Sequence, residues 1–136
     1  MEFLFKPDNL IVTLSSLSYL VSGIFVFRTS PLISVGLILM TCIASLHHSF
    51  PDNIYIRLFD WLSALLLIGW FFYFAYSSHQ IAAFSVIAIV ILIFLLWLTS
   101  FIAFKNEYFL IYNISHASWH ILSAIFIFLL ATKFFT

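Results

Sequence analysis

Five long apolar stretches, separated by short polar connections, constrain the fold more than any other feature of this sequence. They cover residues 9–27, 31–50, 54–77, 80–104 and 108–134. A helix needs about 20 largely apolar residues to cross the hydrocarbon core of a bilayer. Connections of only a few residues place successive helices antiparallel and side by side. We therefore predict an all-α, polytopic membrane helix bundle of about five transmembrane helices, with residues 1–136 forming a single transmembrane domain.

The composition excludes several other classes of protein. Hydrophobic residues make up 65% of the chain and charged residues only 7%, which is more apolar surface than a soluble domain of this size can bury. A net charge of zero leaves no basic patch for nucleic acid. A single cysteine, Cys42, excludes an internal disulfide and a thiolate metal cluster. The expected partners are the bilayer and a membrane lipid, and the sequence does not indicate an oligomeric state.

The ionisable side chains within the apolar stretches gather near one side of the membrane. If successive stretches cross the membrane in alternating directions, three segments lie on the side that holds the N-terminus. They are the end of the second stretch (His47, His48), the start of the third (Asp60) and the first half of the fifth (His116, His120). At about 1.5 Å per residue, the last two histidines lie roughly 12 to 18 Å into their helix. Polar side chains in a bilayer usually face the bundle interior, so we predict a polar site shared by three helices.

His116 and His120 are four residues apart, so a helix presents both imidazoles on one face, one turn apart. Three imidazoles with one open position form a known catalytic zinc arrangement. Zinc lowers the pKa of its water to about 7, which makes hydroxide available at neutral pH. The pair therefore predicts two ligands of a zinc ion. The alternative is a packed helix face whose imidazoles form hydrogen bonds with neighbouring helices.

The second apolar stretch offers the third ligand. Ser45 and His48 share a helix face, whereas His47 points about 100° away. We predict His48 as the third ligand and expect His47 at the membrane interface, although His47 stays the alternative ligand.

Asp60 is the predicted general acid and base, because a carboxylate beside a zinc-bound water can accept and return its proton. Ser45 is predicted to form a hydrogen bond with that water or to help hold Asp60. Two structural roles compete with these assignments. Asp60 could pair with Arg57, one turn away on the same helix, and Ser45 could bond to its own helix backbone.

At three places the sequence resembles the CREST superfamily of membrane proteins. The matching segments are Ser45-Leu46-His47-His48, Leu58-Phe59-Asp60-Trp61 and His116-Ala117-Ser118-Trp119-His120. The superfamily includes alkaline ceramidases, progestin and adipoQ receptors, haemolysin III-like proteins and the relatives of myomaker.

The resemblance implies a membrane-embedded zinc hydrolase that acts on lipid amide or ester bonds. It implies His48, His116 and His120 as zinc ligands, and Asp60 and Ser45 as catalytic partners of the zinc-bound water. The chain departs from the family pattern in two ways. Its serine and histidine are three residues apart instead of four, and it has five predicted helices instead of seven.

Other classes of function stay open from the sequence. The first alternative to a ceramidase-like hydrolase is a receptor or scaffold that binds zinc without turnover. A haem-binding membrane protein fits less well, because histidines at i and i+4 of one helix cannot occupy opposite faces of one haem, and because haem leaves Asp60 without a role.

The basic residues predict the orientation of the chain. Lys6, Arg57 and Lys105 fall on the side of the N-terminus, and Arg28 and Lys133 on the other. Positively charged residues are enriched on the cytoplasmic side of membrane proteins. We therefore expect the N-terminus and the polar site to lie on the cytoplasmic side.

Overall fold

The computed structural model describes residues 7–50, 53–77 and 83–134, and within these ranges the chain forms five α-helices. They are α1 (Pro7–Val26), α2 (Pro31–Ser49), α3 (Ile54–Ser77), α4 (Ala83–Lys105) and α5 (Phe109–Phe134). The predicted boundaries differ from these by at most two residues, with one exception. The start of α4 was expected at residue 80, and residues 78–82 lie outside the described part of the chain.

Three helices are long and apolar enough to cross a membrane, counted over the described ranges. They are α2, residues 87–105 of α4 and residues 109–132 of α5. The apolar part of α1, Leu10–Val26, is shorter. The all-α fold is therefore confirmed, with three candidate membrane spans.

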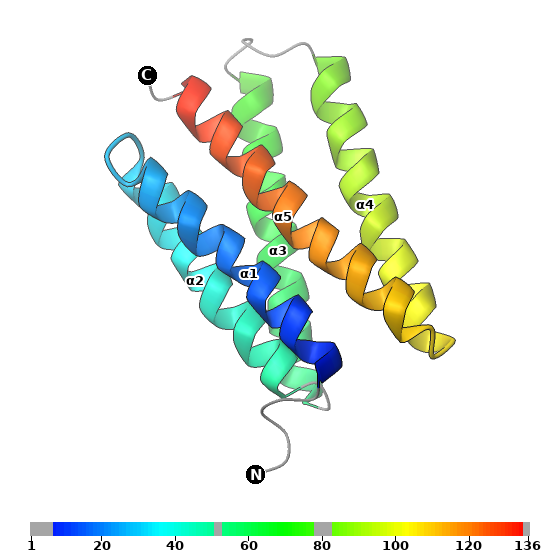
Figure 1. Ribbon diagram of the computed structural model, residues 1–136. Helices are drawn as coiled ribbons and strands as arrows, with labels where there is room; N and C mark the ends of the chain where they lie inside the picture. The colour runs from blue at the N-terminus through cyan, green and yellow to red at the C-terminus, as the bar shows by residue number, and fades with distance from the viewer. Residues whose placement is uncertain (1–6, 51–52, 78–82, 135–136) are drawn as a thin grey trace.

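Successive helices run in opposite directions, and the start of α1 and the end of α5 lie at opposite ends of the bundle (Figure 1). Helix α1 packs lengthwise against both α2 and α5. Helix α5 also packs along α4, and α2 packs against α3, whereas α3 approaches α4 and α5 at only a few points. This topology brings the end of α2, the start of α3 and the first half of α5 to the same end of the bundle.

Helix ends are set by local signals. Pro31 occupies the first turn of α2, where its missing N–H costs no hydrogen bond. Asn53 caps α3, because its Oδ1 accepts the backbone N–H groups two and three residues later at 3.0 and 3.2 Å.

A Schellman turn joins α4 to α5. The Tyr108 N–H donates to the Ala103 carbonyl at 2.9 Å, and the Glu107 N–H donates to the Phe104 carbonyl at 3.2 Å. Glu107 adopts a left-handed backbone with φ of 61°, as this motif requires. The turn determines where α5 begins, and therefore how deep its histidines lie.

The bundle has a polar interior and an apolar surface. Phe25 and Leu32 expose 70% and 74% of their surface, whereas Asp60 and His120 expose 2% and 1%. A soluble protein has the opposite distribution, with few ionisable groups fully buried and no apolar surface of this extent. The pattern is typical of a helix bundle whose outer surface contacts lipid.

Several of the buried aliphatic side chains lie in the half of the bundle opposite the buried histidines. Buried aliphatic side chains come from the end of α1, the start of α2 and the second half of α5, including Val26, Ile33, Leu37, Ile127 and Leu130. The antiparallel topology places all of these segments at the end opposite the histidines. The apolar half can therefore stabilise the fold while the other half holds polar groups.

Helices α1 and α2 pack closely at Gly23. A Cβ atom at this position would lie 3.2 Å from the Ser34 carbonyl oxygen and 3.3 Å from the side chains of Leu37 and Ile38. Small residues allow helix backbones in membranes to pack at such distances. A Cβ atom at Gly69 of α3 would meet nothing within 4 Å.

We predict that Gly23→Val destabilises the fold by about 1–3 kcal/mol, because the added side chain overpacks the α1–α2 contact. Thermal unfolding in detergent should show a clearly lowered midpoint. Gly69→Val is the matched control and should leave the midpoint close to that of the wild type. Equal midpoints for the two variants would contradict the close contact at Gly23.

Candidate metal centre

The two histidines of α5 share one buried face of the helix. His116 and His120 expose 5% and 1% of their surface, and their ring centroids lie 4.8 Å apart. This is the geometry that the i, i+4 spacing predicts.

His48 reaches this pair from the last turns of α2. Its ring centroid lies 5.0 Å from that of His116 and 5.3 Å from that of His120. One ring nitrogen from each of the three residues lies within 4.8 Å of the others. Zinc–nitrogen bonds are about 2.0–2.1 Å long, so only small side-chain movements separate this arrangement from a three-imidazole metal site. The predicted ligands are brought together, and the group could hold a metal ion.

The hydrogen bonding of His116 fits a metal ligand. Both of its ring nitrogens are buried, and neither has a hydrogen-bond partner in the described part of the chain. A buried polar atom without a partner costs roughly 1–3 kcal/mol, and most such groups in proteins are satisfied. A metal ion bound to one of these nitrogens would remove that cost. Imidazole nitrogen is a preferred ligand of zinc.

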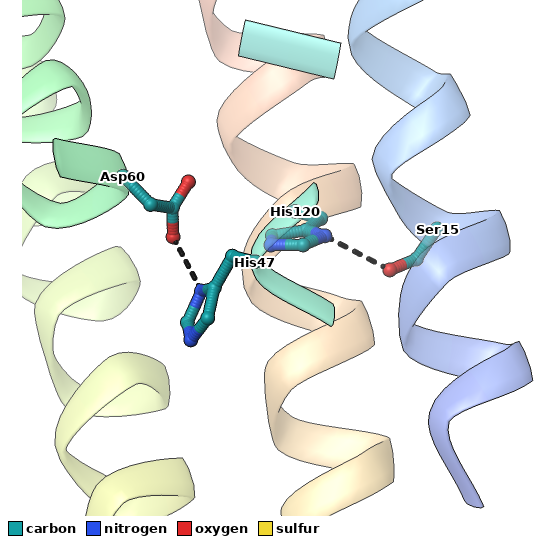
Figure 2. A network of polar contacts seen from close by, with 4 residues as sticks. All are labelled: Ser15, His47, Asp60 and His120. Carbon is teal, nitrogen blue, oxygen red and sulfur yellow. Dashed lines mark hydrogen bonds and ion pairs between the residues drawn. The ribbon is translucent and has the colours of Figure 1, made fainter. Parts of the chain in front are cut away.

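Ser15 of α1 determines which nitrogen of His120 is available to a metal. The Ser15 hydroxyl donates to the Val12 carbonyl at 2.6 Å, and its oxygen lies 3.0 Å from Nδ1 of His120 (Figure 2). Because the hydroxyl proton is already donated, Ser15 Oγ accepts a hydrogen bond from the Nδ1–H of His120. The neutral ring then presents its Nε2 lone pair to the centre of the group. Metal-binding histidines are commonly oriented in this way through their other nitrogen.

His47 faces the interior of the bundle and pairs with Asp60, a contact that the sequence did not predict. Its side chain is buried, and its Nδ1 lies 2.8 Å from Oδ2 of Asp60 (Figure 2). The His47 ring also stacks on His48, with centroids 4.9 Å apart. The physical reason is the cost of a buried carboxylate. Asp60 needs a partner, and the side of α2 next to α3 provides His47.

The ion pair of Asp60 with Arg57, considered as an alternative role, is not formed. Among the described residues Asp60 pairs with His47, while the Arg57 guanidinium lies 6.0 Å from the ring centroid of Trp61. Ser45 lies on α2 facing α1, and its Oγ is 3.1 Å from Oγ of Ser16. The catalytic roles of Asp60 and Ser45 stay predictions.

A cavity of about 320 Å³ opens beside the histidines. Residues of four helices line it: His47 and His48 of α2, Arg57 and Trp61 of α3, Tyr112 and His116 of α5, and a face of α4 from Trp97 to Lys105. A small molecule in this cavity would lie directly beside two of the three clustered histidines.

The contribution of α1 could not be predicted from the motifs, although its serines carry a signal. Ser15, Ser18 and Ser22 are spaced at i, i+3 and i+7, so they share one helix face. Ser18 and Ser22 donate to the carbonyls of His120 and Ala124 at 3.3 and 3.2 Å. This serine face therefore attaches α1 to the histidine helix.

These observations define a helical membrane protein with a buried group of three histidines that could hold a metal ion. Searches against protein-family models, curated proteins and solved structures found no match to this chain.

We predict that the purified protein holds one zinc ion per chain through His48, His116 and His120. The double variant His116→Ala/His120→Ala should lose the metal, because it removes two of three ligands. Ser15→Ala should weaken zinc affinity about 10- to 100-fold, as loss of a hydrogen bond to a ligand typically does. Elemental analysis and chelator competition would measure both effects.

Ser18→Ala is the matched control for this prediction, because within the described residues the Ser18 hydroxyl contacts backbone carbonyls of Ser15 and His120 and no imidazole ring. It should bind zinc as the wild type does. Full zinc retention by the double histidine variant would exclude the three-histidine site.

Proposed function

We propose that this protein is an intramembrane zinc-dependent hydrolase of lipid amide or ester bonds, similar to the ceramidases of the CREST superfamily. The observation that carries the proposal is that two of the three clustered histidines, His48 and His116, line a cavity that His47, the partner of Asp60, also lines. A metal site, an acid–base candidate and space for a substrate are thus adjacent within an apolar bundle.

The proposed hydrolysis needs water as its only co-reactant. The oxygen of water bonds to the acyl carbon, the bond from that carbon to nitrogen or oxygen breaks, and the leaving amine or alcohol gains a proton. Zinc, when bound, acts as a Lewis acid and lowers the pKa of water to about 7. Asp60 accepts the proton of the attacking water and returns it to the leaving group.

His47 supports this role of Asp60 in the proposal. Its Nδ1 contact with Asp60 holds the carboxylate in one orientation, beside a histidine that lines the cavity. Ser45 contacts α1 through Ser16, so we propose that Ser45 acts indirectly, by keeping α2 and its His48 in register with α1.

The proposal includes the membrane topology. All five helices would span the bilayer as one domain, with the N-terminus and the site on the cytoplasmic side and the C-terminus on the opposite side. Arg57 and Lys105 lie at the end of the bundle that holds the histidines, and Arg28 lies at the other. Lys6, the third basic residue of this side, lies outside the described residues.

We predict that the C-terminus lies outside the cytoplasm, because five crossings reverse the side of the chain, so alkaline phosphatase fused there should be active and green fluorescent protein should not fluoresce. Paired alkaline phosphatase and green fluorescent protein fusions would measure this. Fusions at the α1–α2 turn, near Arg28, provide an internal reference and should give the same side as the C-terminus. A C-terminal reporter that works only in the cytoplasm would reverse the orientation or reduce the number of spans to an even one.

We predict that Asp60→Asn lowers lipid turnover about 10²–10⁴-fold, the usual loss for a general acid–base group, while zinc content and folding are kept. Asparagine has a similar size, and its Oδ1 can still accept a hydrogen bond from His47. The measurement is release of fatty acid from ceramide-like and lysolipid-like substrates in detergent, at equal amounts of folded, zinc-loaded protein.

Ser45→Ala is the comparison variant and should reduce turnover much less. Wild-type turnover by Asp60→Asn would remove Asp60 from the mechanism. A zinc-loaded wild type that turns over none of the lipids would favour the receptor or scaffold class instead.

A further inference from the structure

Two cavities of similar size meet end to end inside the bundle. The cavity beside the histidines, about 320 Å³, is called the head chamber here, and the second, about 310 Å³, is called the tail chamber. Trp61 of α3 and Trp97 of α4 line both chambers, and their rings meet edge to face with centroids 6.1 Å apart. The two chambers are therefore neighbours that share these two rings, and one elongated ligand would have to lie across them.

The two chambers follow each other along the bundle axis. On α3 the lining residues run from Arg57 through Trp61 to Leu65, one helical turn at a time. Arg57 and Leu65 are therefore about 12 Å apart along the helix axis, at 1.5 Å per residue. On α5 the order is the same, with His116 lining the head chamber and Trp119, nearly one turn deeper, lining the tail chamber.

The tail chamber suits a hydrocarbon chain. Its lining is apolar apart from the tryptophan rings, with Ala64 and Leu65 from α3 and Val90, Ile93 and Phe94 from α4. Helices α3 and α4, which form most of its wall, approach each other at only a few points. Apolar pockets of this volume are typical of sites for small ligands.

The head chamber carries two cations at its outer end. Arg57 of α3 and Lys105, at the end of α4, both line it. Within the described part of the chain neither side chain forms an ion pair. The buried carboxylate of Asp60 is paired with His47 instead. The Nε of Arg57 is buried and has no hydrogen-bond acceptor. A buried guanidinium nitrogen without an acceptor is costly, and arginine is well suited to bind phosphate and carboxylate groups.

We infer that the substrate is a single-chain lipid with an oxyanion group, such as a phosphate, close to its acyl bond. This inference rests on the proposed hydrolase function and names its substrate class. The acyl chain lies in the tail chamber, the bond to be hydrolysed lies beside His116, and the anionic group is bound by Arg57 and Lys105. The order of tail, carbonyl and anion along the lipid then matches the order of apolar lining, histidines and cations along the bundle.

Binding of lipids that cannot be hydrolysed tests the inference independently of turnover. The probes are the ether lipid 1-oleyl-glycerol 3-phosphate and its neutral counterpart 1-oleyl-glycerol, both radiolabelled and bound to the zinc-loaded protein in non-ionic detergent. The anionic lipid should bind at least about tenfold more tightly, because charge-assisted hydrogen bonds are about twice as strong as neutral ones. Glycerol 3-phosphate should compete only at much higher concentration, because it lacks the chain.

Variants of Arg57 and Lys105 test whether these two side chains bind the anionic group. Arg57→Gln and Lys105→Gln should each weaken binding of the anionic lipid about tenfold and change binding of the neutral lipid less than about twofold. Arg57→Lys should give an intermediate loss, because it keeps the charge without the planar donor pair. Arg28→Gln is the matched control, since Arg28 is exposed in the turn between α1 and α2, at the opposite end of the bundle.

Equal affinity for the two ether lipids would overturn the inference, as would an equal loss in Arg28→Gln and Arg57→Gln. Displacement by glycerol 3-phosphate at concentrations similar to those of the lipid would assign the site to a free phosphate compound. Hydrolysis of neutral lipids without anion preference would leave the proposed function standing while removing this inference. Arg57-dependent binding of the anionic ether lipid, without hydrolysis of the corresponding acyl ester, would support the binding site and remove the proposed function.

Discussion

The contact of α1 with both α2 and α5 is the interaction on which the histidine group depends. Helices α2 and α5 carry the three imidazoles, and α1 packs lengthwise against both. Ser16 contacts Ser45 of α2, and Ser15 contacts the His120 ring of α5. Tight packing at Gly23 holds α1 against α2 further along the bundle. Helix α1 contributes none of the clustered histidines, yet it fixes the register between the two helices that do.

The cost of burying polar groups explains how the rest of the site is arranged. Each buried ionisable side chain needs either a hydrogen-bond partner or a ligand. Asp60 meets this requirement through His47, and His120 meets it through Ser15. His116 has no such partner among the residues that the structure describes. The site is therefore a polar network whose least satisfied member lies where a metal ion would bind.

The closely packed apolar part of the bundle and the candidate site lie at different positions along the bundle axis. Close apolar packing of α1, α2 and α5 fills the half opposite the histidines, whereas α3 and α4 stand further apart and enclose the two chambers. A cavity reduces packing contacts and so costs stability. Placing the chambers beside α3 and α4 leaves the three best-packed helices to hold the fold.

The sequence alone determined the number of helices, their approximate ends and the residues of the histidine group. Apolar stretches of about 20 residues leave little alternative to helices, and the i, i+4 spacing puts His116 and His120 on one face. The alternation of short connections placed His48 at the same end. The tertiary structure alone decided that Asp60 pairs with His47 instead of Arg57, that Ser15 orients His120, and that two chambers meet at Trp61 and Trp97. These features depend on rotations of helices about their axes and on contacts between residues up to 105 positions apart, which local periodicity does not encode.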